Sequence, residues 1–505
     1  MTTSQTRPPR SLFPVKYLFP LTIALIFGLG LAARLYQIDQ APFEFHPTRQ
    51  FYSALKARGM YYQALPDAPA WKRDLAVRQW QSDVELEPPL LEHLVVFTYR
   101  FTGEELWVAR VYSIVFWLIG GLFLFLLAQK LTSPAGGAVS LAFYLLSPYG
   151  VAASRTFQPD ALMMMLIILF WWIMERWGRN PTWLLTILAG LAGGLSILVK
   201  FPAVFFVVGG ALGVIFAFTT FRQTLRLPQT WLMVVLGILP AGMYTVNGIL
   251  HGTLSDEFAN RILPQLLLDP FFYIRWFNKA VMVVDVVIIA IALLSTFVFA
   301  NRVTRHLFIG LWAGYLGLGL VLTHHISSHD YYSLPLVPIT ALAIAPLAAD
   351  FYRTINDRLA QSRILRLVSA ALFLFALLGA FWTIRTNMSL NNFTSQVELN
   401  QQIGEALNHQ PGVIAVITDY GYPLEYYGWQ NNDPWPLSAD LKTKYFPTVF
   451  TRLAGHKSYF LITDFDEFDR QPQLKKYLYD QYPVLLQGKG YLVFDLLHPL
   501  GSVRK

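Results

Sequence analysis

Long apolar runs constrain the fold of this chain more than any other feature. A segment of roughly twenty apolar residues can cross about 30 Å of hydrocarbon as an α-helix. Such runs lie near residues 17–36, 106–128, 134–150, 160–175, 182–199, 202–220, 230–250, 280–300, 307–323, 334–349 and 365–383. The sequence therefore predicts a polytopic α-helical membrane protein with about eleven transmembrane helices.

Composition supports this fold class and excludes several kinds of chemistry. Of the 505 residues, 54% are hydrophobic and only 14% are charged, whereas soluble domains carry about 25% charged residues. The chain has no cysteine, which excludes disulfides, thiolate catalysis and cysteine metal sites. The net charge of +8 comes from basic residues scattered between apolar runs, so we expect a lipid bilayer and no nucleic acid as partner.

Basic residues also predict the orientation. Arg7, Arg10 and Lys16 precede the first run, and no small-residue cleavage site stands out before Tyr36, which favours an uncleaved helix. Lys and Arg collect in short cytoplasmic loops. With a cytoplasmic N-terminus, every predicted inner loop contains a basic residue; these loops are Lys130 and residues 175–180, 221–226, 301–306 and 350–366. An odd number of spans then leaves the C-terminus outside.

Two regions should lie outside the membrane. The first outer loop covers about residues 37–105, within a membrane domain of residues 1–385. In residues 386–505, strand-like stretches such as "GVIAVITD" and "YFLITDF" alternate with helix-like ones such as "QPQLKKYLYDQY". This alternation predicts a small C-terminal α/β domain on the outer face.

The stretch "PFEFHPTRQF" brings Glu44, His46 and Arg49 together just after the first apolar run. Pro47 suits the first position of a following helix, because the N–H that proline lacks would have no partner there. The positive end of such a helix favours a carboxylate and can bind a phosphate oxygen. In the plainer alternative, His46 caps the helix and the two charges are interfacial, and this stretch alone supports both interpretations equally.

Other predicted outer junctions carry charges as well. They are Glu87 before a Pro-Pro pair, Arg155 and Asp160 in "SRTFQPD", and Lys200 at the end of "GGLSILVK". Taken singly, Glu87 is best explained as part of a rigid loop corner, and charges placed like Arg155 and Asp160 are often membrane anchors. For Lys200, snorkelling and a functional role are equally good explanations. A charge inside the mouth of a membrane helix is nevertheless a candidate functional residue.

The stretch "THHISSHDYYSLPLVP" contributes His329, Asp330, Tyr331 and Tyr332 at a further outer junction. Histidine and aspartate can bind a metal ion through nitrogen and oxygen. The spacing matches no standard zinc site, so we assign no metal ligand and no cofactor, and keep a divalent metal as the lesser alternative. Tyrosines at this depth are also typical of the interfacial aromatic belt.

All of these stretches fall on the outer side under an orientation that other residues determine. Arg49, Arg155 and Lys200 can neutralise phosphate groups in an outward-facing pocket, and Glu44 or His46 can accept a proton. The remaining candidates would line that pocket; they are Glu87, Asp160, His329, Asp330, Tyr331 and Tyr332.

The order of these motifs resembles the polytopic C superfamily of glycosyltransferases. The similarity is closest to the family of protein O-mannosyltransferases and lipid A aminoarabinose transferases, which carry an acidic motif in the first outer loop and then a Pro-Pro-Leu element. Here the matching stretches are "FEFHPTRQ", "EPPL", "ARVYSIVFWLIGGLFLFLLAQKL", "SRTFQPD" and "HDYYSLPLVP". The resemblance covers most of residues 15–350, and the tail is not diagnostic.

This resemblance implies a sugar donor linked to polyprenyl phosphate and inverting transfer to an acceptor hydroxyl on the outer face. The acceptor, a lipid, a glycan or a protein, stays open. Glu44 is the first candidate for the base because carboxylates act as the base in similar enzymes. His46 is the second, because the usual Asp-Glu motif is replaced here. The absence of cysteine and of a eukaryotic retention signal favours a bacterial cytoplasmic membrane.

Two alternatives belong to other classes. A transporter or flippase of a lipid-linked sugar would share the apolar bulk and the cations, but it should show inverted repeats and helices broken at mid-membrane. A membrane scaffold with an outer binding domain would explain the tail and leave the outer-loop charges without a role. The gathering of polar groups at one face therefore favours the transferase.

Overall fold

The computed structural model describes residues 17–83, 87–251, 262–359, 362–439 and 446–500. Within these residues, six helices are long and apolar enough to cross a membrane: Leu18–Leu35, Leu106–Leu131, Asp160–Arg179, Pro228–Leu250, Asp330–Asn356 and Leu367–Ala406. A helix pair bent by 89°, Pro270–Val283 with Val286–Phe299, would make a seventh if it is one span. The chain is thus a mostly helical, multi-pass membrane protein.

Eleven spans, the number expected from the sequence, are not confirmed. Three apolar helices are shorter than a usual span: α6 (Pro134–Leu146), α9 (Trp183–Val199) and α10 (Ala203–Phe218). Proline explains the shortest, because Pro148 cannot donate the N–H that would continue α6 and instead begins α7 (Pro148–Ala153). The apolar run near 280–300 is divided similarly where the Asp285 side chain caps a new helix by accepting from the Val287 N–H at 2.8 Å.

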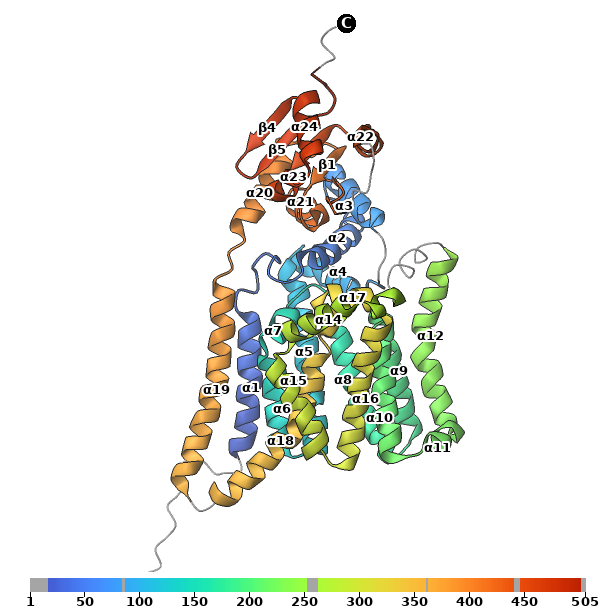
Figure 1. Ribbon diagram of the computed structural model, residues 1–505, viewed down its shortest axis with the longest axis vertical. Helices are drawn as coiled ribbons and strands as arrows, with labels where there is room; N and C mark the ends of the chain where they lie inside the picture. Colours follow the sequence, from blue (N-terminus) through green and yellow to red (C-terminus); the bar gives the residue numbers. More distant parts are fainter. Residues whose placement is uncertain (1–16, 84–86, 252–261, 360–361, 440–445, 501–505) are drawn as a thin grey trace, which may run out of the picture.

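The membrane region is a bundle of helices that run side by side (Figure 1). Its other long helices are α1 (Leu18–Leu35), α5 (Leu106–Leu131), α8 (Asp160–Arg179), α12 (Pro228–Leu250), α16 (Arg302–Val321), α18 (Leu336–Leu359) and α19 (Arg363–Ser389). Shorter elements connect them: α11 (Phe221–Arg226), η2 (Pro264–Leu268), α14 (Pro270–Val283), α15 (Val286–Leu294), η3 (Ser295–Phe299), α17 (Thr323–Ser328) and η4 (Asp330–Ser333).

Small residues allow the closest helix contacts. A Cβ atom on Gly209 of α10 would lie 2.4 Å from the carbonyl oxygen of Gly310 in α16, so only glycine permits this approach. Elsewhere Trp117 of α5 stacks on Tyr144 of α6, with ring centroids 4.5 Å apart. Such packing stabilises helices within a membrane, where lipid is as apolar as the side chains.

One buried arginine ties the first helix to the bundle. Arg34 of α1 donates from Nε to Ser154 Oγ at 2.6 Å and from Nη1 to the Leu145 carbonyl oxygen at 2.7 Å. Its side chain is fully buried, and no carboxylate pairs with it among the described residues. The charge is therefore satisfied by a hydroxyl and helix-end carbonyls, which fixes α1 against α6 and α7.

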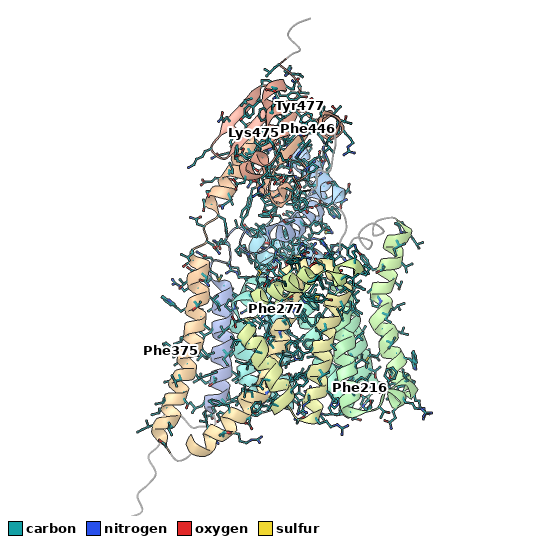
Figure 2. All side chains as sticks on the ribbon, in the orientation of Figure 1. Phe216, Phe277, Phe375, Phe446, Lys475 and Tyr477 are labelled. Carbon is teal, nitrogen blue, oxygen red and sulfur yellow. The ribbon has the colours of Figure 1, made fainter. Side chains whose placement is uncertain are left out.

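Apolar side chains face outward around the bundle. Phe216 of α10, Phe277 of α14 and Phe375 of α19 are each more than half exposed (Figure 2). On a soluble protein a continuous surface of this kind would mark an interface. On these helices it is the surface expected to contact lipid.

The first outer loop folds into three helices at one end of the bundle: α2 (Pro47–Gln63), α3 (Ala70–Ser82) and α4 (Leu90–Thr102). A core of Phe51, Leu55, Leu91 and Val95 joins α2 to α4, and Tyr426 from the C-terminal region completes it. Because α2 is buried along most of its length, its position is determined by neighbours on all sides.

The C-terminal region contains the expected small sheet. Its strands are β1 (Val413–Val416), β2 (Asp433–Pro434), β3 (Tyr459–Ile462), β4 (Val484–Gly488) and β5 (Tyr491–Asp495), in the order β2-β1-β3-β5-β4. β1 pairs in parallel with β2 and β3, and β5 pairs antiparallel with β3 and β4. The helical elements are α20 (Thr394–Ala406), η5 (Asp419–Gly421), α21 (Tyr422–Tyr427), α22 (Phe446–Ala454), α23 (Phe465–Asp469) and α24 (Pro472–Gln481).

This C-terminal region sits on the first outer loop, with the membrane bundle on the loop's other side (Figure 1). Arg58 of α2 donates to the Tyr426 carbonyl oxygen at 2.6 Å and lies over the Tyr426 ring at 3.7 Å. Trp71 of α3 stacks on His409, with centroids 4.8 Å apart. Two segments far apart in sequence therefore form one packed unit above the bundle.

Candidate functional site

The candidate residues converge where the first outer loop meets the ends of the membrane helices. His46 is the N-cap of α2, and Pro47 is the first residue of that helix, as the sequence predicted. His46 Nε2 lies 2.8 Å from Asp330 Oδ1. The backbone of His46 is left-handed, with φ of 46°, a conformation that costs energy outside glycine and is often found at functional sites.

A second pair joins two membrane helices. Lys200 ends α9 and Asp160 begins α8, and the lysine Nζ lies 2.9 Å from both carboxylate oxygens. Both side chains are buried. Lys200 Nζ also lies 4.7 Å from the ring centroid of Tyr331, and that ring is 4.9 Å from the ring of His46. Tyr331 therefore connects the lysine pair to the histidine pair.

Arg49 and Glu87 form a third pair. The Arg49 Nη2 atom donates to both oxygens of Glu87, at 2.9 and 2.7 Å. Burial by itself would lower the pKa of Arg49, but the charge and hydrogen bond of Glu87, together with Tyr331, raise that pKa above its ordinary value. In the described part of the chain, the buried Nε atom of Arg49 has no hydrogen-bond partner.

We call His46, Arg49, Asp160, Lys200, Asp330 and Tyr331 the Tyr331 cluster. Its members come from distant parts of the sequence and meet where α2, α8, α9 and η4 begin or end. The cluster holds three cationic or titratable nitrogen groups beside carboxylates and a phenol, an arrangement that can bind a phosphate and hold a base next to it.

Glu44 pairs with an arginine of α5. Its Oε1 atom accepts from Arg110 Nη2 at 2.8 Å, and both side chains are buried. Glu44 Oε2 is also buried and has no partner among the described residues. Sequence reasoning did not select Arg110, although a charged residue inside the apolar run 106–128 is the kind of signal that could have identified it.

Arg155 lies with Glu44 rather than with Lys200. It donates from Nη2 to the Gln37 carbonyl oxygen at 2.8 Å and contacts Met388 Sδ at 3.3 Å from Nη1. Burial and, to a smaller extent, the charge of Arg110 lower the pKa of Arg155 to about 10, although Glu44 acts in the opposite direction. We call Glu44, Arg110 and Arg155 the Glu44 cluster.

His329 and Tyr332 lie at the edge of the Tyr331 cluster. His329 Nδ1 is 2.7 Å from Ser328 Oγ, and its ring is 5.3 Å from that of Tyr331. Burial lowers the pKa of His329 to about 4, and the nearby His46 and His324 contribute in the same direction. No group of three or more histidine or acidic side chains suited to a metal ion occurs in the part of the chain that the structure describes.

The chain is similar to known proteins in part of its sequence and in its fold. Residues 86–244 match the family described as dolichyl-phosphate-mannose-protein mannosyltransferase, a stretch shorter than half of the chain. The structure is similar to ArnT from Cupriavidus metallidurans bound to undecaprenyl phosphate, with a TM-score of 0.58 and 13% sequence identity over 95% of this chain and 98% of that one. The chain has the fold of the C-superfamily glycosyltransferases.

A second C-superfamily enzyme has a similar structure. The oligosaccharyltransferase AglB from Archaeoglobus fulgidus, in complex with an inhibitory peptide and a dolichol-phosphate, gives a TM-score of 0.53 and 12% identity over 92% of this chain and 73% of that one. The comparison with curated proteins found no match. The resemblance to the C superfamily that the motifs predicted is therefore confirmed at the level of the fold, and the family match over residues 86–244 agrees with it.

Proposed function

We propose that this C-superfamily protein moves a sugar from a polyprenyl-phosphate donor to an acceptor hydroxyl on the outer face of a membrane. The observation that carries the proposal is the Tyr331 cluster, in which one tyrosine ring lies within 5 Å of both the Lys200 ammonium and the His46 ring. A phosphate-binding cation and a candidate base are thus neighbours. Transfer from a lipid phosphate requires that proximity.

Lys200 and Arg49 are the proposed ligands of the donor phosphate. An ammonium carries three N–H donors, so those not used by Asp160 can bind phosphate oxygens. Arg49 pairs with Glu87 through Nη2, and its buried Nε donor has no hydrogen-bond partner within the described residues. Asp160 and Glu87 orient the two cations, and the proposal therefore moves Arg155 from donor binding to the Glu44 cluster.

His46 is the better placed of the two candidate bases. About a quarter of its side chain is exposed, whereas Glu44 is 9% exposed and engaged with Arg110. Pairing of Nε2 with Asp330 favours the tautomer that leaves a lone pair on Nδ1. A carboxylate that orients a histidine in this way also stabilises the imidazolium that forms when the histidine takes a proton.

The proposed reaction is a single displacement. His46 Nδ1 takes the proton of the acceptor hydroxyl while the hydroxyl oxygen forms a bond to the anomeric carbon of the sugar. The bond from that carbon to the phosphate oxygen breaks, and the electron pair leaves with the polyprenyl phosphate. Lys200 and Arg49 stabilise the charge that develops on the leaving phosphate. Attack from the opposite face inverts the anomeric centre.

The topology follows from the same proposal. The N-terminus would be cytoplasmic, and residues 386–505 would form an outer domain packed on the first outer loop. Tyr331, Tyr332 and His329 would line the pocket for the sugar. The lipid tail would lie against apolar helix surfaces, so donor binding would be mainly hydrophobic with a charged end. A bacterial cytoplasmic membrane is the setting that the sequence favours.

The test is release of free polyprenyl phosphate. Purified protein in lipid is given polyprenyl-phosphate sugars and a crude envelope extract as acceptor, beside His46→Asn and Glu44→Gln variants. Release by the wild type that is lost in His46→Asn supports transfer with His46 as the base. Loss in Glu44→Gln alone would return that role to Glu44.

A transporter of lipid-linked sugar is the alternative, and the same preparation tests it. If the intact donor crosses the bilayer and no polyprenyl phosphate is released with any donor, the pocket carries the lipid-linked sugar without reacting, and the transferase proposal fails.

A further inference from the structure

The C-terminal domain reaches the start of α2 through the loop that follows β1. In this loop, Asp419 Oδ1 accepts from the Thr48 hydroxyl at 2.8 Å. Thr48 lies two residues after His46, so this bond is only about 3 Å further along the axis of α2 than the proposed base. The C-terminal domain is therefore attached to the proposed active site as well as to the later turns of α2.

Three consecutive residues of this loop have a left-handed backbone. They are Asp419, Tyr420 and Gly421, with φ of 51°, 57° and 78°. Glycine adopts this conformation freely and aspartate tolerates it, but a tyrosine is strained there. Such strain persists only where the surrounding structure imposes it, and it is concentrated at functional sites. The Tyr420 side chain is 65% exposed, so burial of the ring does not offset the strain.

A row of aromatic rings runs from Tyr420 toward the proposed phosphate ligand. The ring centroid of Tyr420 is 6.3 Å from that of Tyr422, which is 6.2 Å from that of Tyr52. The guanidinium carbon of Arg49 lies 5.4 Å from the Tyr52 centroid. Tyr52 is buried and Tyr422 is half-buried, so Tyr420 is the exposed end of the row. Thr48 and Tyr52 are four residues apart, so the loop and the row meet the same face of α2.

The position of the loop in the sheet also favours ligand binding. β1 pairs in parallel with β2 on one side and with β3 on the other. The chain passes from β1 to β2, returns to β3 and then continues to β4 and β5 beyond it. The connections that leave the carboxyl ends of β1 and β3 therefore run to opposite sides. In open α/β sheets, ligands bind in the crevice at such a point, and the loop of Asp419 and Tyr420 leaves the sheet there.

We propose that Tyr420 and Asp419 form the acceptor-binding edge of the proposed active site, and that the acceptor group bound there is a saccharide. The apolar face of a sugar ring packs on an aromatic ring, and sugar hydroxyls donate to a carboxylate. Thr48 uses one acceptor position of Asp419, whereas a carboxylate offers about four. The negative charge of Asp419 disfavours an anionic group at this place.

This inference rests on the proposed transfer reaction and adds the class of acceptor and the residues that select it. Tyr420 and Asp419 belong to neither the Tyr331 cluster nor the Glu44 cluster. A saccharide on Tyr420 would lie beside the N-terminal end of α2, where His46 is the proposed base. The C-terminal domain would then supply acceptor binding, and the membrane helices would supply donor binding.

Acceptor dependence tests the two residues. Release of polyprenyl phosphate by full-length protein in lipid is measured against the concentration of crude envelope extract, and separately against that of the polyprenyl-phosphate sugar. Tyr420→Asn removes the ring and suits the left-handed backbone, so the loop should keep its fold. This variant should raise the half-saturating concentration of extract about tenfold, the size of one ring contact, and leave that of the donor unchanged. Tyr420→Phe keeps the ring and should behave as the wild type.

Stability separates acceptor binding from a structural role. Tyr420→Asn relieves backbone strain, so its thermal midpoint should equal or exceed that of the wild type. Tyr479→Ala removes a half-exposed ring from α24 of the same domain and should leave both half-saturating concentrations unchanged. Wild-type dependence on extract in Tyr420→Asn overturns the proposal. So does a lower thermal midpoint with equal losses for donor and acceptor, because the ring is then structural.

Treatment of the extract tests the class of acceptor. Periodate cleaves the diols of sugars and should abolish acceptor activity, whereas protease digestion should leave it intact. Acceptor activity that survives periodate, or that is lost on protease digestion, overturns the saccharide assignment. No release by the wild type with any donor and untreated extract is a different result, because it removes the proposed transfer reaction and this inference together with it.

Discussion

His46 and Asp330 form a direct pair, with Nε2 and Oδ1 2.8 Å apart. The two residues are far apart in the sequence, since His46 precedes α2 and Asp330 begins η4. Histidine–carboxylate pairs of this kind hold the imidazole ring in one tautomer and orientation. The pair therefore holds the candidate base of the proposed function in one orientation.

Asp330→Asn should lower turnover by about 10²-fold or more, because the amide no longer favours the tautomer with a free Nδ1 lone pair. Donor binding should change little, since Asn preserves the volume and one hydrogen bond. Turnover and donor affinity are measured separately, by release of polyprenyl phosphate and by equilibrium binding of the donor. An Asp330→Asn enzyme with normal turnover would show that His46 works without its partner or does not act as the base.

Lys200→Met should weaken binding of polyprenyl phosphate by about tenfold to a hundredfold, the range of one charge-assisted phosphate contact. Part of any loss could come from leaving Asp160 buried without its cation. The double variant Lys200→Met/Asp160→Asn removes that penalty and is the matched control. If the double variant binds the lipid phosphate as tightly as the wild type, Lys200 is structural and the phosphate site lies elsewhere.

Arg34→Met should destabilise the membrane region, because it removes the hydrogen bonds to Ser154 and to the Leu145 carbonyl and leaves both groups buried. The loss should be about 2–4 kcal/mol, the usual result of breaking buried charged hydrogen bonds. A thermal scan in detergent measures it as a lower midpoint. Arg222→Gln removes the same charge at an exposed position of α11 and should leave the midpoint nearly unchanged.

The contact between α3 and α21, in which Tyr422 donates to Asp83 at 3.1 Å, should weaken as pH rises. The pKa of Glu425 is raised from 4.5 to about 8 and that of Asp83 from 3.8 to about 6, so the folded contact binds more protons than the unfolded chain between about pH 4 and pH 8. Its stability is therefore full at acidic pH and is lost as pH rises through this window.

Hydrogen exchange of α3 and α21 at pH 6 and pH 8.5 measures that change, with rates corrected for the intrinsic pH dependence of exchange. Glu425→Gln should remove most of the difference, because a neutral amide cannot lose a proton. Equal protection of the wild type at both pH values would contradict the assignment of a proton-linked pair.

The sequence predicted the local features better than the pairings. Pro47 marked the start of α2 correctly because its effect on a helix is confined to its own turn. The number of spans was not confirmed, since hydropathy alone does not show that Pro148 and Asp285 interrupt two apolar runs. Which cation meets which carboxylate depends on how helices pack, so neither the partnership of Glu44 with Arg110 nor that of His46 with Asp330 could be read from spacing.

The contact between α3 and α21 could not be predicted from the sequence for the same reason. Asp83 and Glu425 each look like ordinary surface acids in their own segments, and only the docking of α21 on α3 buries them together. The C-terminal sheet was predictable because its strands are short apolar runs that follow the period of a β-strand.

The continuity of α2 has a mechanical consequence. His46 and Arg49 lie at the N-terminal end of α2. About three turns further on, Arg58 donates a hydrogen bond to Tyr426 of the C-terminal domain and stacks on its ring. A helix is stiff over this distance, and α2 is packed on all sides, so it holds the C-terminal domain and the proposed donor site at a fixed spacing. A displacement of the domain would therefore be transmitted along α2 to His46, the proposed base, and to Arg49, the proposed phosphate ligand.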